Sequence, residues 1–162
     1  MVSAVRERDG FREIVAVLVS GTESEATYHE LFRSLKGRSI SRVESVASDD
    51  YEGLKAAAFR HFQEASWQRC QLHYARNLLS TVGAAKRKEI AEDLRAIFAA
   101  TTSRDQALGI ASSVAEKWRS ETGAAKVADY LEEHVEECLS CLAFPESHRE
   151  PLIRTTNGLE RA

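Results

Sequence analysis

Residues 43–50, Val-Glu-Ser-Val-Ala-Ser-Asp-Asp, predict a short buried strand that ends in a polar, acidic segment. The apolar and β-branched residues stop at Ala47, and residues 48–50 close the strand. Apolar residues then recur at helical spacing from Leu54 to Phe62, which predicts a helix. A strand followed by an acidic loop and a helix is typical of an α/β fold.

Upstream of this stretch, the sequence predicts a β-hairpin. Residues 14–19 form an apolar run rich in β-branched side chains, which is typical of a buried strand. The Asp9-Gly10 pair before this run favours a tight turn. Residues 3–6 are therefore expected to belong to a preceding strand.

Further helices and strands continue the alternation. Thr22 or Ser24 can cap a helix that ends near Gly37. Residues 66–69 predict a third strand, which leads into a helix that contains Leu72. Alternating strands and helices indicate parallel neighbours in an α/β layer.

Residues 84–143 contain no proline and no strand pattern, and they predict an all-helical block. Three helices are expected, at residues 85–100, 103–121 and 124–142. We therefore divide the chain into a partial α/β core, a helical insertion, and a loop followed by the start of a helix, at residues 1–83, 84–143 and 144–162.

Composition and charge bound the classes of function. The 162 residues are 43% hydrophobic, enough for one folded unit, and the net charge of -3 gives no overall basic field that would attract nucleic acid. Cationic residues nevertheless gather in one part of the chain, at Arg69, Arg76, Lys86, Arg87 and Lys88. This cluster has two interpretations, contact with nucleic acid or ordinary exposed basic side chains on helices.

Nothing in the sequence indicates a membrane or secreted protein. No run approaches the roughly 20 apolar residues of a membrane helix, and charges at residues 6–9 stand where a signal peptide would be apolar. Three cysteines are too few, and odd in number, for a disulfide framework. We expect a cytoplasmic protein with reduced thiols.

Two carboxylates lie where catalytic groups are often found. Asp49 directly follows a predicted parallel strand, where α/β sheets place ligands and catalytic groups. The alternative is a helix cap, because Ser48, Asp49 and Asp50 all favour that position. Glu160 lies in the first turn of a predicted helix, where the helix dipole favours any carboxylate, so its position alone indicates no function.

Two pairs of potential zinc ligands are present. Cys70 and His73 form a C-x-x-H pair, and Cys138 and Cys141 form a C-x-x-C pair, which together could supply four tetrahedral ligands. The alternative is that the cysteines are small core residues, because Cys138 and Cys141 share an apolar helix face.

Four blocks of sequence carry a resemblance to a known family. They are the Ser-Asp-Asp-Tyr-Glu-Gly-Leu-Lys-Ala-Ala block at 48–57, the Trp-Gln-Arg-Cys-Gln-Leu-His-Tyr-Ala-Arg-Asn-Leu block at 67–78, Ala-Phe-Pro at 143–145 and Thr-Asn-Gly-Leu-Glu-Arg at 156–161. In order and spacing they resemble the Mutator-family transposases of bacterial insertion sequences. Residues 20–25 and 35–38 also resemble this family, so the resemblance covers nearly the whole chain.

The resemblance implies an RNase H-like core interrupted by an all-helical insertion, and a D-D-E triad of catalytic carboxylates. Asp49 matches the second aspartate and Glu160 the glutamate, and both would bind Mg²⁺ or Mn²⁺ for phosphoryl transfer. Cys70 and His73 match the family's C-x-x-H signature beside the site.

The resemblance also implies partners. DNA is expected at the element's terminal repeats and at the target, with Arg69, Arg76 and Arg161 contacting backbone phosphates. The full-length protein is expected to be a homo-oligomer in the bacterial cytoplasm.

The first aspartate of the triad would fall ahead of Met1, so we expect the 162-residue polypeptide to have little or no activity by itself. Two alternatives remain. One is a non-enzymatic remnant that at most pairs with intact transposase or binds DNA weakly, and the other is a helical interaction module stapled by zinc.

Overall fold

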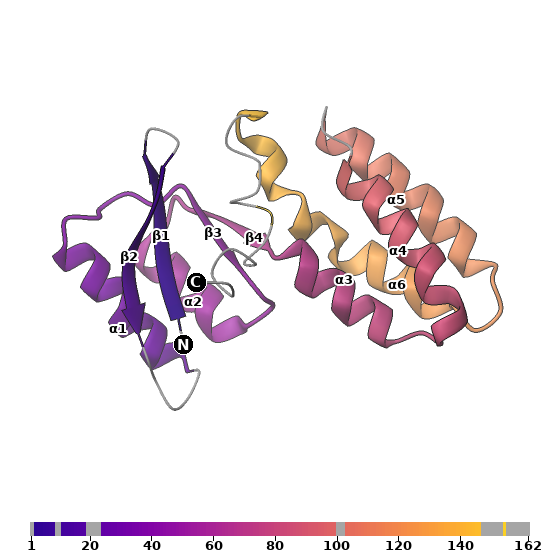
Figure 1. The fold of residues 1–162 in the computed structure, drawn as a ribbon, viewed down its shortest axis with the longest axis horizontal. Coiled ribbons are helices and arrows are strands. Elements are labelled where there is room, and N and C mark those ends of the chain that lie inside the picture. The colour runs from indigo at the N-terminus through magenta and orange to yellow at the C-terminus, as the bar shows by residue number, and fades with distance from the viewer. Residues whose placement is uncertain (1, 9–10, 19–23, 100–102, 147–153, 155–162) are drawn as a thin grey trace. The chain divides into compact units, whose positions relative to one another are not determined.

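The computed structural model describes residues 2–8, 11–18, 24–99, 103–146 and 154. Figure 1 shows their elements in chain order. These are β1 (Val2–Arg8), β2 (Phe11–Leu18), α1 (Glu25–Gly37), β3 (Ser45–Ser48), α2 (Glu52–His61), β4 (Ser66–Arg69), α3 (Gln71–Ser80), α4 (Ala84–Ala99), α5 (Arg104–Arg119), α6 (Ala125–His134) and the 3₁₀ helices η1 (Val135–Cys138) and η2 (Ser140–Ala143).

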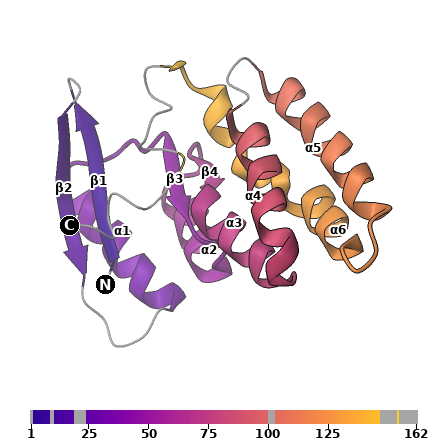
Figure 2. The same ribbon diagram turned by 45° about the vertical axis from the view of Figure 1, so that its right-hand side comes forward.

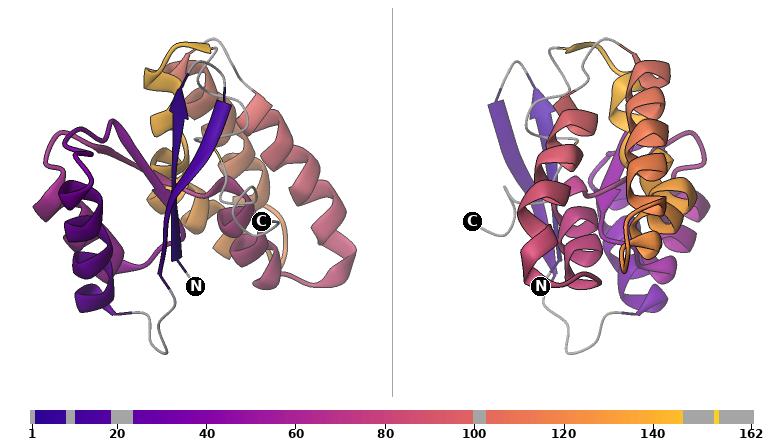
Figure 3. Two further views of the ribbon diagram at one scale, coloured as in Figure 1. Left: turned by 60° about the vertical axis from the view of Figure 1, so that its left-hand side comes forward. Right: turned by 90° about the vertical axis from the view of Figure 1, so that its right-hand side faces the viewer.

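β1 and β2 form the predicted antiparallel hairpin. Val2 lies opposite Leu18 at one end of the register, and Arg8 lies opposite Phe11 at the other. Figure 3 shows how the two strands twist across each other, as paired strands of L-residues do. The turn predicted at residues 9–10 lies outside the described residues.

β3 and β4 form a second, two-stranded sheet. The backbone N–H of Ser66 donates to Glu44 O at 3.0 Å, and that of Cys70 donates to Ser48 O at 2.7 Å. From the first of these hydrogen bonds to the second, both strands advance by the same number of residues toward the C-terminus. The strands are therefore parallel, as predicted. β4 coincides with the predicted third strand.

The chain divides into two compact units, Met1–Val46 with Asp50–Ser66, and Ala47–Asp49 with Trp67–Ala162. In the first unit, α1 and α2 pack together through side chains spaced three and four residues apart. The buried residues of this core include Tyr28, Leu31, Phe32, Leu35, Ala57, Ala58 and Phe62. Ser24 is the N-cap of α1, and its side chain accepts from the Thr27 backbone N–H at 3.2 Å. One of the two predicted caps is thereby confirmed.

In the second unit, α3 to α6 enclose a helical core (Figure 2). Trp118 is buried, and its indole Nε1 donates to Asp93 Oδ2 at 2.7 Å, which ties α5 to α4. The Ser103 side chain accepts from the Gln106 backbone N–H and caps α5. Gly123 takes φ 75°, a left-handed conformation that suits glycine, between α5 and α6. The predicted breaks between helices are therefore confirmed.

The prediction of a third helix at residues 124–142 is wrong beyond His134. There α6 ends, and the chain continues as η1 and η2. Gln71 Nε2 donates to Cys138 O at 2.9 Å, and Gln68 Oε1 accepts from the Cys141 backbone N–H at 2.7 Å. These buried side chains satisfy backbone groups that an α-helix would pair internally, which explains the change to 3₁₀ geometry.

The predicted α/β class agrees with this mostly helical structure and its parallel strand pair. The described strands form two separate two-stranded sheets, and the RNase H-like core stays a prediction. Among the described residues, no helix combines the length and apolar character that crossing a bilayer requires.

Candidate functional site

Asp49 lies immediately after β3, at the carboxyl end of a parallel strand. The backbone before it is held on two sides. Ser48 O accepts from the Cys70 backbone N–H at 2.7 Å, and Ser48 Oγ accepts from Trp67 Nε1 at 2.9 Å and donates to Asp49 O at 2.7 Å. Ser48 is buried, whereas Asp49 is exposed. These hydrogen bonds hold the main chain at Asp49, whereas its side chain lies in solvent.

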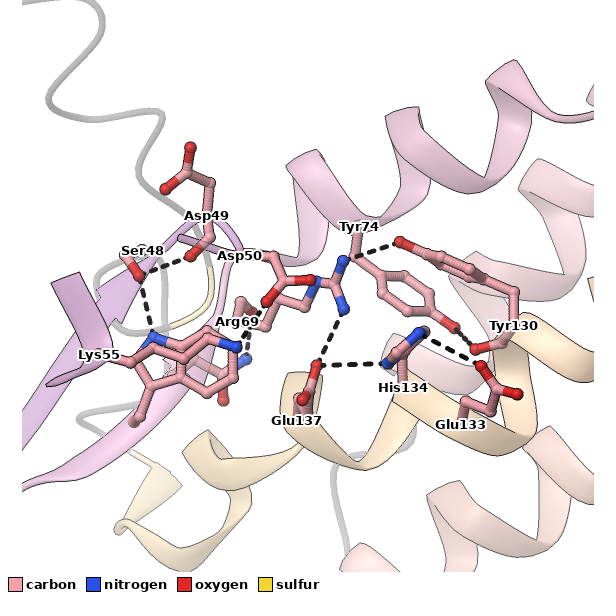
Figure 4. Close-up of polar contacts among 12 residues, drawn as sticks. Ser48, Asp49, Asp50, Lys55, Arg69, Tyr74, Tyr130, Glu133, His134 and Glu137 are labelled. Carbon is pink, nitrogen blue, oxygen red and sulfur yellow. Dashed lines mark hydrogen bonds and ion pairs between the residues drawn. The ribbon is translucent and has the colours of Figure 1, made fainter. Parts of the chain in front are cut away.

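The alternative interpretation of Asp49 as a helix cap is wrong. The N-cap of α2 is Tyr51, and no side chain makes a capping hydrogen bond there. Within the part of the chain that the structure describes, the Asp49 carboxylate makes no hydrogen bond or ion pair, and Figure 4 shows it turned away from the contacts drawn. Within the described residues, the Asp49 side chain is exposed.

The neighbouring Asp50 forms an ion pair with Lys55. Lys55 Nζ donates to Asp50 Oδ1 at 2.5 Å and to Glu52 Oε1 at 2.6 Å. Burial lowers the pKa of Lys55, but the two carboxylates outweigh it and raise the pKa overall. Two adjacent aspartates thus have different surroundings, one ion-paired and one open.

The C-x-x-H pair lies at the start of α3. Cys70 is buried directly before this helix, and His73 is partly buried within its first turn. Together with Cys138 and Cys141, they are the four residues that the sequence offers as possible zinc ligands. Among the described residues, no three His, Cys, Asp or Glu side chains come together in a group that could hold a metal ion.

The three cysteines instead behave as core residues. Cys70, Cys138 and Cys141 are free thiols, and all are buried. Burial raises the pKa of Cys138 well above its usual range, which keeps the thiol protonated. The structure therefore favours the core-packing alternative over the zinc-stapled module.

Arg69, predicted as a phosphate contact, is only 3% exposed. Its guanidinium donates to Glu137 Oε2 and to the Tyr130 hydroxyl, both at 2.9 Å (Figure 4). The same group lies over the Tyr74 and Tyr130 rings, 5.4 Å and 5.6 Å from their centroids. Sequence reasoning missed Glu137 and Tyr130 because they lie more than sixty residues away, with no local pattern to mark them.

Arg76 is the second arginine that the sequence predicts as a phosphate contact. It is exposed on α3 and lines an open groove of about 450 Å³ with Arg87. Apolar residues also line this groove, namely Leu72, Ala75 and Leu79.

Other members of the basic cluster have protein partners. Lys86 Nζ donates to Glu121 Oε1 at 2.9 Å and to Thr122 O at 2.5 Å, and Arg87 Nε donates to Val82 O at 3.2 Å. Two of the predicted site residues, Glu160 and Arg161, lie outside the described residues.

Comparison with known proteins places these residues in a family context. The sequence profile of the family described as "Transposase, Mutator family" matches residues 2–162. A transposase for insertion sequence element ISRM5 from Rhizobium meliloti is 33% identical over 153 residues, which cover 94% of this chain and 37% of the relative. One for IS406 from Burkholderia multivorans is 35% identical over 156 residues, 96% of this chain and 39% of the relative. One for IS256 from Staphylococcus aureus is 38% identical over 91 residues, 56% of this chain and 23% of the relative. The chain thus spans less than half the length of these relatives.

Proposed function

Because the chain belongs to the Mutator family of transposases, we propose that it forms part of a catalytic domain that cuts and joins DNA at the ends of an insertion element. The observation that carries the proposal is the open Asp49 carboxylate at the end of a parallel strand. The aspartate that resembles the family's catalytic residue is also the one that the fold leaves without a partner among the described residues.

Asp49 fits the role of a ligand to a divalent cation. Mg²⁺ and Mn²⁺ prefer carboxylate oxygens, and Asp49 is an exposed carboxylate on a backbone held by Ser48. In this proposal Glu160 supplies the second carboxylate. When bound, a pair of such ions activates the attacking oxygen and stabilises the leaving oxygen of phosphoryl transfer.

The chain's own residues would position the DNA. Arg76 and Arg161 are proposed to contact backbone phosphates, which fix the register of a duplex without reading its sequence. For Arg69, burial and its contacts with Glu137 and Tyr130 support a positioning role, in which it holds β4 to α6 and η1. The proposal also includes an RNase H-like core, self-association of the full-length protein and a cytoplasmic site of action.

A chimera tests this proposal without knowledge of the chain's own DNA ends. The 156 matched residues of the Burkholderia multivorans relative would be replaced by this chain, and movement of that relative's own element would be measured in cells. We expect Asp49→Asn to reduce transposition at least about a hundredfold, because a neutral amide cannot balance the charge of a divalent ion.

Asp50→Asn is the matched control, because it removes the same charge one residue away. It breaks an ion pair with Lys55 on a partly exposed surface, so transposition should change by no more than a few-fold. Equal losses in the two variants would contradict the proposal. A folded chimera that does not move the element would favour the non-enzymatic remnant.

A further inference from the structure

Two histidines from different helices meet in the first unit. His29 lies in α1, His61 is the last residue of α2, and His29 Nδ1 is 2.9 Å from His61 Nε2. The ring centroids are 5.0 Å apart, with the ring planes at 55°. Without a ligand, one nitrogen donates a hydrogen bond to the other.

We propose that His29 and His61 form a bidentate imidazole site for a divalent transition-metal ion, which would clamp α1 to α2. Neutral imidazole nitrogens are common ligands of Ni²⁺, Cu²⁺ and Zn²⁺. The site involves neither Asp49 nor any residue of the proposed DNA-cutting function, so it stands or fails independently.

A carboxylate already orients one of the two rings. Glu25 Oε1 accepts from His29 Nε2 at 3.1 Å, one helical turn earlier on α1. This contact places the His29 proton on Nε2, so without an ion His29 Nδ1 accepts from His61 Nε2–H. When an ion binds, His61 carries its proton on Nδ1 instead, and its Nε2 lone pair becomes a ligand. A histidine whose second nitrogen donates to a carboxylate is the arrangement that supports metal ligands in proteins.

The separation of the two nitrogens indicates the preferred geometry. With metal–nitrogen bonds of about 2.0–2.1 Å, nitrogens 2.9 Å apart subtend about 90° at the ion. That angle matches adjacent positions of an octahedral or square-planar ion, whereas a tetrahedral ion needs a separation of about 3.3 Å. Ni²⁺ and Cu²⁺ therefore fit better than Zn²⁺, with water completing the shell.

The surroundings leave the site accessible and restrict the class of ion. The His29 side chain is 18% exposed, and His61 is partly buried beside the Phe32 and Phe62 rings. Burial, the charge of His29 and the cations of Lys36, Arg33 and Arg60 lower the pKa of His61, which favours the neutral ring. The site offers imidazole nitrogens and no oxygen ligand directly, which disfavours hard ions such as Mg²⁺.

The test is a titration of the tag-free chain with NiCl₂ at about pH 7.5, where imidazole is neutral. Calorimetry would give the stoichiometry and affinity, and NMR of the histidine rings would locate the ion. We expect one site per chain, Cu²⁺ binding tighter than Ni²⁺, and no competition by Mg²⁺. The ring signals of His29 and His61 should broaden before those of His73 and His134.

Three variants and one control separate this site from others. His29→Asn and His61→Asn should each weaken Ni²⁺ binding at least tenfold, and Glu25→Gln by about tenfold, because loss of an orienting partner typically costs this much. The control is His134→Asn, which removes a histidine that lies near Glu133 and Glu137. Its affinity for Ni²⁺ should be unchanged.

Unchanged affinity in His61→Asn, or broadening of His73 or His134 first, would overturn the proposal. The NMR measurement uses the unsubstituted chain, so it decides the question even where a variant fails to fold. Failure here would leave the transposition result for Asp49 untouched, and the reverse also holds.

Discussion

Arg69 is a buried cation that depends on partners from a distant part of the sequence. Its guanidinium, 3% exposed, is neutralised by Glu137 and lies over two tyrosine rings. A buried charge is costly unless it is paired, so the partners stabilise a side chain that would otherwise be strongly unfavourable in the core. Removing the charge leaves Glu137 and the Tyr130 hydroxyl without their donor.

We therefore predict that Arg69→Met lowers the free energy of unfolding by about 2–4 kcal/mol. Arg69→Lys should recover only part of this loss, because an ammonium group cannot reproduce the planar fork that contacts both partners. Urea unfolding followed by circular dichroism would measure both changes. A loss below about 0.5 kcal/mol in Arg69→Met would show that the cluster contributes no net stability.

Arg76→Met is the matched substitution at an exposed site. Its free energy of unfolding should stay within about 0.5 kcal/mol of the parent, because an exposed side chain away from special contacts contributes little. Binding to a generic DNA duplex should weaken, with a shallower dependence on salt, because one phosphate contact is lost. Fluorescence anisotropy at several salt concentrations would measure this. The opposite pattern, with DNA binding lost only in Arg69→Met, would exchange the roles given to the two arginines.

At the scale of helices, two glycines of the helical block have opposite requirements. Gly123 takes φ 75° between α5 and α6, a conformation that costs an L-residue with a Cβ about 1–2 kcal/mol. Gly109 lies inside α5, where a Cβ would meet no atom within 4 Å.

Gly123→Ala should therefore destabilise the chain by about 1–2 kcal/mol, whereas Gly109→Ala should stabilise it by about 0.5–1 kcal/mol. Thermal unfolding of the two variants against the parent would measure both changes. The pair controls for the added methyl group, because each substitution adds the same atom. Equal shifts of the melting temperature would mean that the turn after α5 differs from the one described.

For the molecule as a whole, the burial of all three cysteines makes thiol chemistry a reporter of unfolding. Cys70, Cys138 and Cys141 have no access to solvent, and burial raises the pKa of Cys138, so little thiolate forms. We predict that iodoacetamide labels them only as fast as the second unit opens. Mass spectrometry of the folded and urea-unfolded chain would show no labels and three labels, respectively.

The zinc-stapled alternative predicts a different response of the thiols and of the melting temperature to a chelator. If Cys70 and His73 shared an ion with the other two cysteines, a chelator would lower the melting temperature and expose the thiols. We expect neither effect, because the cysteines are buried in the core. Two glutamine side chains there form hydrogen bonds with the backbone of Cys138 and Cys141. A chelator-dependent loss of stability would restore the zinc-stapled module.

The sequence alone determined the elements whose signals are local. Strand β4, the antiparallel hairpin, the cap at Ser24 and the break at Gly123 follow from β-branched runs, capping side chains and glycine, which act within a few residues. It also placed Asp49 at the end of a parallel strand.

Only the tertiary structure decided which side chains those elements bring together. The burial of Arg69, the end of α6 at His134 and the meeting of His29 with His61 depend on contacts across 32 to 73 residues, which no local pattern encodes. The exposure of the Asp49 side chain is likewise known only from the tertiary structure. Ser48, Asp49 and Asp50 are equal candidates for capping by residue type, but α2 begins after Tyr51, which is its N-cap, and none of the three caps it.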